Sequence, residues 1–123
     1  MTRRVLIIDD DATIREITAI TLTHVAGYEV SAAASGAEGV ASALADVPDA
    51  ILLDVMMPGL DGPSTLAQLL DDDLTRDVPV VFLTAKVQPS ERARLEGLGV
   101  RGVIAKPFDA MQLVGDLNRL LAW

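Results

Sequence analysis

Short apolar runs recur along the chain and are separated by longer amphipathic stretches. Four runs are almost entirely aliphatic or β-branched, and a weaker one lies between the first two: Val5–Ile8, Tyr28–Ala32, Ala50–Leu53, Val78–Leu83 and Gly102–Ala105. Continuous apolar runs of this length are typical of strands that are covered on both faces, as in parallel sheets. The pattern therefore predicts five buried, parallel strands.

The stretches between these runs carry signals for helix termini. Thr13 and Ser35 each stand three residues before a glutamate, which is the capping-box pattern at a helix N-terminus. Other residues that suit helix starts or ends are Pro63, Pro89, Asp109 and, after the first helix, Gly27. Five strands that alternate with five helices predict a doubly wound α/β sheet with right-handed crossovers.

The composition fits one packed domain over residues 1–123 and excludes several functions. Half of the 123 residues are apolar, which suits a single core and argues against disorder. The chain has no cysteine, which excludes disulfides, thiolate zinc sites and a thiol nucleophile. A formal net charge of −8 disfavours a basic surface for nucleic acid. No apolar run approaches the ~20 residues of a membrane span, so we expect a soluble, cytoplasmic domain.

Charged and hydroxyl side chains follow four of the predicted strands. Asp9 and Asp10 follow the first run, Asp54 the third, and Thr84 and Lys106 the fourth and fifth. Because ligands bind at the carboxyl ends of strands in open parallel sheets, we expect these side chains to share one concavity. The three carboxylates suit Mg²⁺, and the lysine and hydroxyl suit an anion. The combination indicates phosphoryl chemistry.

Four blocks of the sequence resemble the receiver domains of the two-component response regulator family. They are Val5–Asp10, Leu53–Gly62, Leu83–Ala85 and Lys106–Phe108, in this order and at the predicted strand ends. The resemblance covers essentially the whole chain and is to the CheY-like, single-domain members of the family. It implies a flavodoxin-like fold, with strand order 2-1-3-4-5 and five helices.

The same resemblance implies a role for each candidate site residue. Asp54 would be the phospho-acceptor, with Thr84 and Lys106 binding the phosphoryl group. The Mg²⁺ ligands would be Asp9, Asp10, Asp54 and the backbone carbonyl of Met56. The phosphoryl group would come from a sensor histidine kinase, a histidine phosphotransfer protein or a small donor such as acetyl phosphate. The protein would not be a turnover enzyme, because it would catalyse only its own phosphorylation and slow dephosphorylation.

Three positions depart from the family pattern. Val103 stands where the family usually has an aromatic residue, so the usual inward swing of a ring cannot operate. We therefore expect the signal to leave through backbone shifts around residues 87–98. Met56 and Lys86 flank the path of an attacking water in this family, and neither can orient one as a carboxamide or carboxylate would. They predict slow loss of the phosphoryl group. Lys106–Pro107 resembles the family's cis peptide.

The last predicted helix has two apolar stripes. The first, interpreted as core, consists of Ala110, Leu113, Leu117 and Leu120. The second, beside it, consists of Met111, Val114 and Leu121. A second stripe indicates either ordinary surface apolarity or a docking face within residues 90–121, for a downstream protein target or a homodimer.

Two alternatives stay open at this point. The run from Asp9 to Thr13 also matches the Asp-x-Asp-x-Thr pattern of haloacid-dehalogenase-type phosphatases, in which Asp9 would be the nucleophile. That interpretation leaves the block after Asp54 unexplained. The second alternative is a degenerate receiver that binds a partner without phosphorylation. Asp11 is interpreted as a cap or turn residue, and His24 is given no role.

Overall fold

Five strands and five helices alternate along the described part of the chain. The computed structural model describes residues 2–85 and 88–123. The strands are β1 (Arg4–Ile8), β2 (Glu29–Ala33), β3 (Ala50–Asp54), β4 (Val80–Thr84) and β5 (Gly102–Ala105). The helices are α1 (Ala12–His24), α2 (Gly36–Ala45), α3 (Gly62–Leu70), α4 (Pro89–Glu96) and α5 (Ala110–Leu121). Within these ranges, no helix combines the length and the apolar character that a membrane crossing requires.

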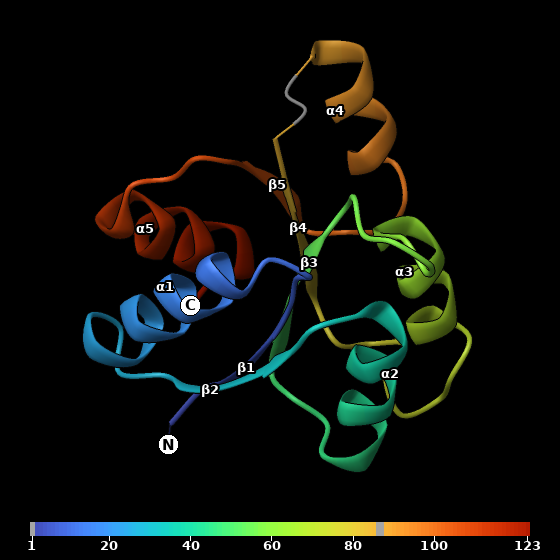
Figure 1. Ribbon diagram of the computed structural model, residues 1–123, viewed down its shortest axis with the longest axis horizontal. Helices are drawn as coiled ribbons and strands as arrows, with labels where there is room; N and C mark the ends of the chain where they lie inside the picture. Colours follow the sequence, from blue (N-terminus) through green and yellow to red (C-terminus); the bar gives the residue numbers. More distant parts are fainter. Residues whose placement is uncertain (1, 86–87) are drawn as a thin grey trace.

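All five strands form one parallel sheet in the order β2-β1-β3-β4-β5 (Figure 1). The doubly wound arrangement is the one that the apolar pattern predicts, and the flavodoxin-like strand order is the one that the family resemblance implies. The strand order reverses direction at β1, between β2 and β3, and this reversal places the carboxyl ends of β1 and β3 side by side. Open sheets of this type bind ligands at such a switch point.

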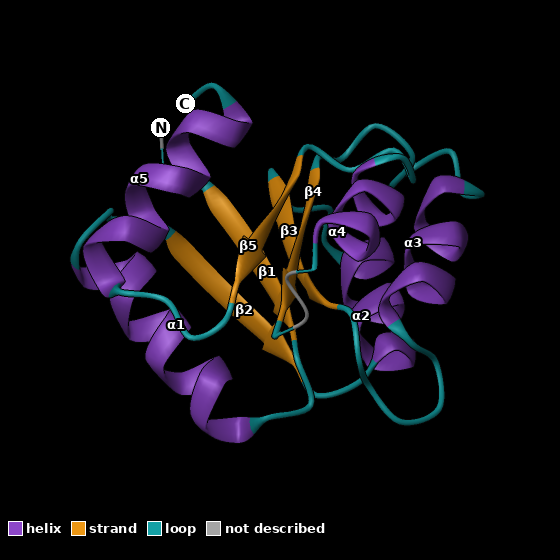
Figure 2. Cartoon of the chain, turned by 90° about the horizontal axis from the view of Figure 1, so that it is seen from above, coloured by secondary structure: helices purple, strands orange, loops and turns teal. Residues whose placement is uncertain are grey.

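Helices cover both faces of the sheet, as continuous apolar strands require. Helices α1 and α5 lie on one face, and α2, α3 and α4 on the other (Figure 2). Successive strand residues point to opposite faces, so β1 sends Val5 and Ile7 into the α1/α5 core and Leu6 and Ile8 into the other. All four of these side chains are buried.

The helix starts are fixed mainly by side-chain caps. Asp11, not Thr13, caps α1: its carboxylate accepts hydrogen bonds from the backbone N–H groups of Thr13 and Ile14. The prediction of a cap at Thr13 is therefore wrong, and the interpretation of Asp11 as a cap is confirmed. Ser35 caps α2 and Asp109 caps α5, as predicted.

The apolar face of α5 differs from the predicted stripes. Its buried residues are Leu113, Leu117 and Leu121, which lie four residues apart along the helix. Ala110, assigned to the core, is exposed, and Leu121, assigned to the outer stripe, is in the core. The outer stripe is thus reduced to Met111, which is 66% exposed, and the half-buried Val114.

Arg3, just before β1, and Trp123, just after α5, come together at the amino-terminal end of the sheet. The Trp123 ring makes an edge-on contact with Tyr28, with ring centroids 5.3 Å apart. The Arg3 guanidinium lies over the Trp123 ring at 4.7 Å, and the Tyr28 hydroxyl donates a hydrogen bond to Asn118. These aromatic and cation–π contacts tie the end of α5 to the segments that lead into β1 and β2.

Candidate functional site

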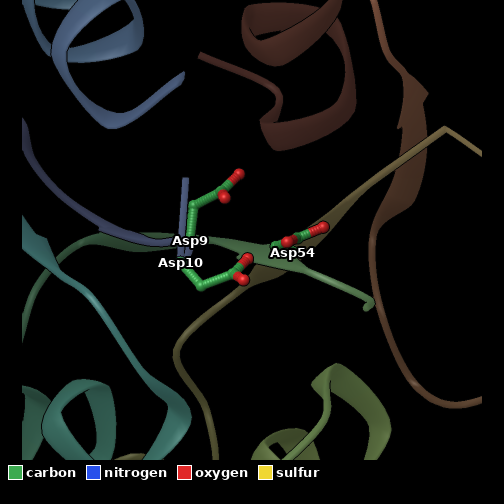
Figure 3. A group of neighbouring side chains, drawn as sticks. All are labelled: Asp9, Asp10 and Asp54. Atoms are coloured by element: carbon green, nitrogen blue, oxygen red, sulfur yellow. The ribbon is translucent and has the colours of Figure 1, made fainter. Parts of the chain in front are cut away.

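Four strand ends bring the predicted site residues together. Asp9 and Asp10 follow β1, Asp54 ends β3, Thr84 ends β4 and Lys106 follows β5. The carboxylates of Asp9, Asp10 and Asp54 offer oxygen atoms that all lie within 4.8 Å of one another (Figure 3). The expectation that three acids share one concavity is confirmed by this geometry.

These side chains line a hollow of about 240 Å³ at the carboxyl edge of the sheet. Met56 lies at this hollow and is 60% exposed, whereas Asp9 and Thr84 in its wall are almost fully buried. The complete lining is Asp9, Asp10, Asp11, Asp54, Met56, Thr84, Ala85 and Lys106. Every residue predicted for the site therefore borders one open cavity. Lys86 lies outside the described residues.

Lys106 contacts two carboxylates of the acidic cluster through its side chain and the end of β4 through its backbone. Its Nζ lies 2.7 Å from Asp9 Oδ2 and 3.3 Å from Asp54 Oδ1. Its backbone N–H donates to the Thr84 carbonyl oxygen at 2.8 Å, and the Lys106–Pro107 peptide is cis, as the family resemblance implies. Burial alone would lower the pKa of the Lys106 ammonium, but the hydrogen bond to Asp9 and the charges of Asp54 and Asp9 outweigh it and raise the pKa. The lysine is a fixed cation.

Burial makes the Asp54 carboxylate costly to ionise. Its side chain is 8% exposed. Burial, followed by the negative charge of Asp9, raises the pKa of Asp54 to about 6, although the positive charge of Lys106 opposes the shift. An acid with this pKa is mostly ionised at neutral pH. A cation beside it would stabilise the ionised form and lower the pKa.

Gly62, at the start of α3, allows this helix to lie directly on the backbone of Asp54. A Cβ atom at Gly62 would stand 2.5 Å from the Asp54 carbonyl oxygen and 2.7 Å from Val55 Cα. The Gly62 N–H donates to the Val55 carbonyl oxygen at 2.9 Å, and Asp61 caps the helix. The Asp-Gly-Pro sequence indicates a helix start, but it does not reveal this close approach.

Arg15 makes a second contact that the sequence does not reveal, a hydrogen bond to the backbone of Asp9. Its Nη1 atom donates a hydrogen bond of 2.8 Å to the carbonyl oxygen of Asp9. Long polar side chains that reach back to a main-chain carbonyl leave no periodic signal in a sequence. Only the position of Arg15 in the first turns of the helix after the acidic pair could have drawn attention to it.

The donor set fits a hard divalent cation. Carboxylate oxygens and water are the ligands that Mg²⁺ prefers, and an open hollow leaves room for waters and a phosphate oxygen. The buried negative charge of Asp9 and Asp54 is only partly balanced by Lys106. A cation between the carboxylates would complete this balance.

A parallel α/β sheet with an acid cluster, a threonine and a lysine at one edge defines a phosphoryl-transfer site of the receiver type. The chain belongs to the response regulator receiver domain family, whose family model matches residues 5–118. The family is a phospho-accepting signalling module rather than a conventional enzyme, and its active site binds Mg²⁺. This assignment excludes the phosphatase interpretation with Asp9 as nucleophile.

The chain spans nearly the full length of some similar proteins. The chain is 37% identical over 120 residues to the protein PilH of Pseudomonas aeruginosa, covering 97% of this chain and 98% of PilH. The structure of the chemotaxis response regulator CheY4 of Vibrio cholerae matches with a TM-score of 0.91 and 32% identity, over 98% of this chain and 99% of CheY4. The chain spans only 48% and 52% of two transcriptional regulators that are each 38% identical.

A second similar structure contains a metal ion. The receiver domain of the sensor histidine kinase PA1611 from Pseudomonas aeruginosa has a magnesium ion coordinated in its active site cleft. It matches with a TM-score of 0.87 and 29% identity, and the match covers 100% of both chains. Receivers of this family take their phosphoryl group from histidine kinases.

Proposed function

We propose that Asp54 accepts the phosphoryl group in this receiver domain, which spans residues 1–123. The observation that carries the proposal is the position of Asp54: its carboxylate lies within 4.8 Å of those of Asp9 and Asp10, and its Oδ1 atom is 3.3 Å from the Lys106 ammonium. Its ionised oxygen attacks phosphorus, the P–N bond of a phosphohistidine breaks, and the departing imidazole nitrogen takes up a proton. No further co-reactant is needed.

The other site residues bind and orient the phosphoryl group. Lys106 supplies a positive charge next to the reacting oxygen, and Thr84 supplies a hydroxyl from the neighbouring strand end. The residues that would hold Mg²⁺ are Asp9, Asp10, Asp54 and the backbone carbonyl of Met56. The bound cation would neutralise charge on the transferring phosphoryl oxygens. Asp9 already accepts a hydrogen bond from Lys106, so it would contribute to the cation site less directly than Asp10 and Asp54.

The phosphoryl donor in the cell would be a sensor histidine kinase or a histidine phosphotransfer protein, acting in the cytoplasm. The phosphorylated state would then bind a downstream protein or a second copy of this chain through residues 90–121. This face contains a hollow of about 310 Å³ between α4, β5 and α5, with Arg92 and Phe108 in its wall. Sedimentation with and without beryllofluoride, a phosphoryl mimic, tests for the second copy.

Intact-mass measurement after incubation with acetyl phosphate and Mg²⁺ tests the acceptor. The wild type should gain one phosphoryl group, Asp54→Asn should gain none, and Asp9→Asn should gain it more slowly. The exposed Asp77 gives the control, because Asp77→Asn changes the net charge equally and should behave as wild type. Loss of the adduct only in Asp9→Asn would contradict the proposal, and no adduct in the wild type would favour the degenerate, non-phosphorylated receiver.

A further inference from the structure

Three of the groups that hold Asp9 act on its amide and its carboxylate. Its backbone N–H donates to the Ala33 carbonyl oxygen at 3.1 Å, which extends the pairing of β1 with β2. Its Oδ1 accepts from the Asp11 N–H at 2.9 Å, and its Oδ2 accepts from Lys106 Nζ at 2.7 Å. The last two bonds fix the Asp9 side chain, but none of the three acts on the peptide that leads on to Asp10.

The Arg15 guanidinium holds that next peptide. The Asp9 carbonyl oxygen, which accepts the 2.8 Å bond from Arg15 Nη1, belongs to the same planar unit as the backbone nitrogen and Cα of Asp10. Asp9 is fully buried, so its carbonyl oxygen depends on a protein donor. The direction of the Asp10 side chain therefore depends on a bond that Arg15 makes.

The backbone of Arg15 is itself held in place. Arg15 lies in the first turns of α1, where its own N–H donates to the Asp11 carbonyl oxygen at 3.0 Å. The Asp11 side chain caps the same turn through Thr13 and Ile14. The Arg15 side chain is half-buried, which limits its freedom. A charged donor anchored on a capped helix turn is a stiff support for the loop that carries Asp10.

We infer that Arg15 is a positioning residue for the metal site: it orients the Asp9–Asp10 peptide so that the exposed Asp10 carboxylate faces Asp54. The inference rests on the proposed metal site and concerns a residue that does not itself touch the cation. Outer partners of this kind fix the direction of metal ligands and strongly affect affinity.

Two effects of Arg15 oppose each other, and this makes the inference testable. Its positive charge, six residues from Asp9 and close in space, repels a cation and weakens Mg²⁺ binding. Its hydrogen bond orients a ligand and strengthens Mg²⁺ binding. Removal of the side chain therefore tightens binding if Arg15 acts only as a charge, and weakens binding if Arg15 acts as a positioning residue.

The test is the Mg²⁺ affinity of the full chain, measured by calorimetric titration without a phosphoryl donor. Arg15→Met should bind Mg²⁺ about tenfold more weakly than wild type. Arg15→Lys keeps the charge and one donor group, so its affinity should lie between the two. Arg76 pairs with Asp73 beyond the opposite end of β4, and Arg76→Met, the charge-matched control, should retain wild-type affinity.

A spectroscopic measurement separates positioning from general damage. In metal-free Arg15→Met, the amide NMR signals of Asp10 and Asp11 should shift, whereas those of Val81 and Phe82 in the sheet interior should not. Urea unfolding checks that each variant is folded, and Arg15→Gln replaces Arg15→Met, with the same expectation, if the latter does not fold. Equal or tighter Mg²⁺ binding by the neutral variant would overturn the inference. A wild type that binds no Mg²⁺ would contradict the proposed function as well.

Discussion

The Arg92 guanidinium on α4 donates a hydrogen bond of 2.9 Å from Nη2 to the carbonyl oxygen of Val103 on β5. Helix α4 has few other ties to the sheet: Leu95 is its one buried residue, and Gln88 provides no side-chain cap for its N-terminus. Val103 also has no ring, whereas the family resemblance leads us to expect an aromatic residue at this position. Arg92 therefore forms a direct polar link between α4 and β5, the strand that pairs with the one ending at Thr84.

Replacement of Arg92 should uncouple α4 from the site. In Arg92→Met, beryllofluoride should still shift the amide NMR signals of Thr84 and Ala105, but the shifts of Ser90 to Glu96 should be much smaller than in wild type. Arg94 gives the control, because its ion pair with Glu91 stays within α4. Undiminished α4 shifts in Arg92→Met would show that the signal takes another route.

Substitution of Gly62 should destabilise the protein. In Gly62→Ala, the added Cβ would meet the backbone at Asp54 and Val55. Because neither backbone segment can yield easily, we expect a loss of about 1–3 kcal/mol in the free energy of unfolding. Gly115 in α5 has open space around it, so Gly115→Ala should instead add up to ~1 kcal/mol. Urea unfolding measures both, and equal effects would contradict the steric argument.

Neutralisation of Asp54 should stabilise the metal-free protein at neutral pH. Because its pKa of about 6 in the folded state exceeds the ordinary value of 3.8, the folded protein holds this proton to higher pH than the unfolded chain. Stability therefore falls as the pH rises from about 4 to 6. Asp54→Asn should raise the Tm at pH 7 by roughly 4 °C.

Thermal unfolding in EDTA checks this expectation. The difference between Asp54→Asn and wild type should nearly vanish at pH 4, where the carboxyl is protonated. Added Mg²⁺ should stabilise the wild type more than the variant. Asp77→Asn controls for net charge, and a destabilised Asp54→Asn at pH 7 would show that its contact with Lys106 outweighs its burial.

The lifetime of the phosphoryl group should depend on the rim of the hollow. Met56 lines the hollow with an exposed thioether, which cannot orient a water molecule. The double variant Met56→Asn with Lys86→Glu should lose the phosphoryl group faster than wild type, because the family resemblance implies that these two positions flank the attacking water, where polar groups can orient it. The decay of the phosphorylated mass after removal of acetyl phosphate measures this rate. An unchanged decay would contradict the role of these positions.

The strand ends were predictable because a parallel sheet leaves a strong signal. Continuous apolar runs that end in Asp9, Asp54, Thr84 and Lys106 place all four groups at one edge, whatever the details of the helices. The receiver assignment follows from the same residues. The chemistry of the site is therefore visible in the sequence before any side-chain geometry is known.

Helix details were less predictable because neighbouring residues compete for the same role. Asp11 and Thr13 both suit a helix cap, and the bonds from Thr13 and Ile14 N–H groups to Asp11 decide between them. In α5, the rotation of the helix against β5 decides which leucines are buried. A Cβ at Gly102 would stand 2.6 Å from Leu120 Cδ2, so this packing depends on a residue from another element.

The aromatic pair at the amino-terminal end of the sheet determines what intrinsic fluorescence can report. Trp123 is the only tryptophan and Tyr28 the only tyrosine in the chain, and both lie at the end of the sheet opposite the acidic hollow. A cation that binds beside Asp54 has no indole nearby to quench. An emission change on phosphorylation would therefore be a remote signal, produced only if α5 moves against the segments that lead into β1 and β2.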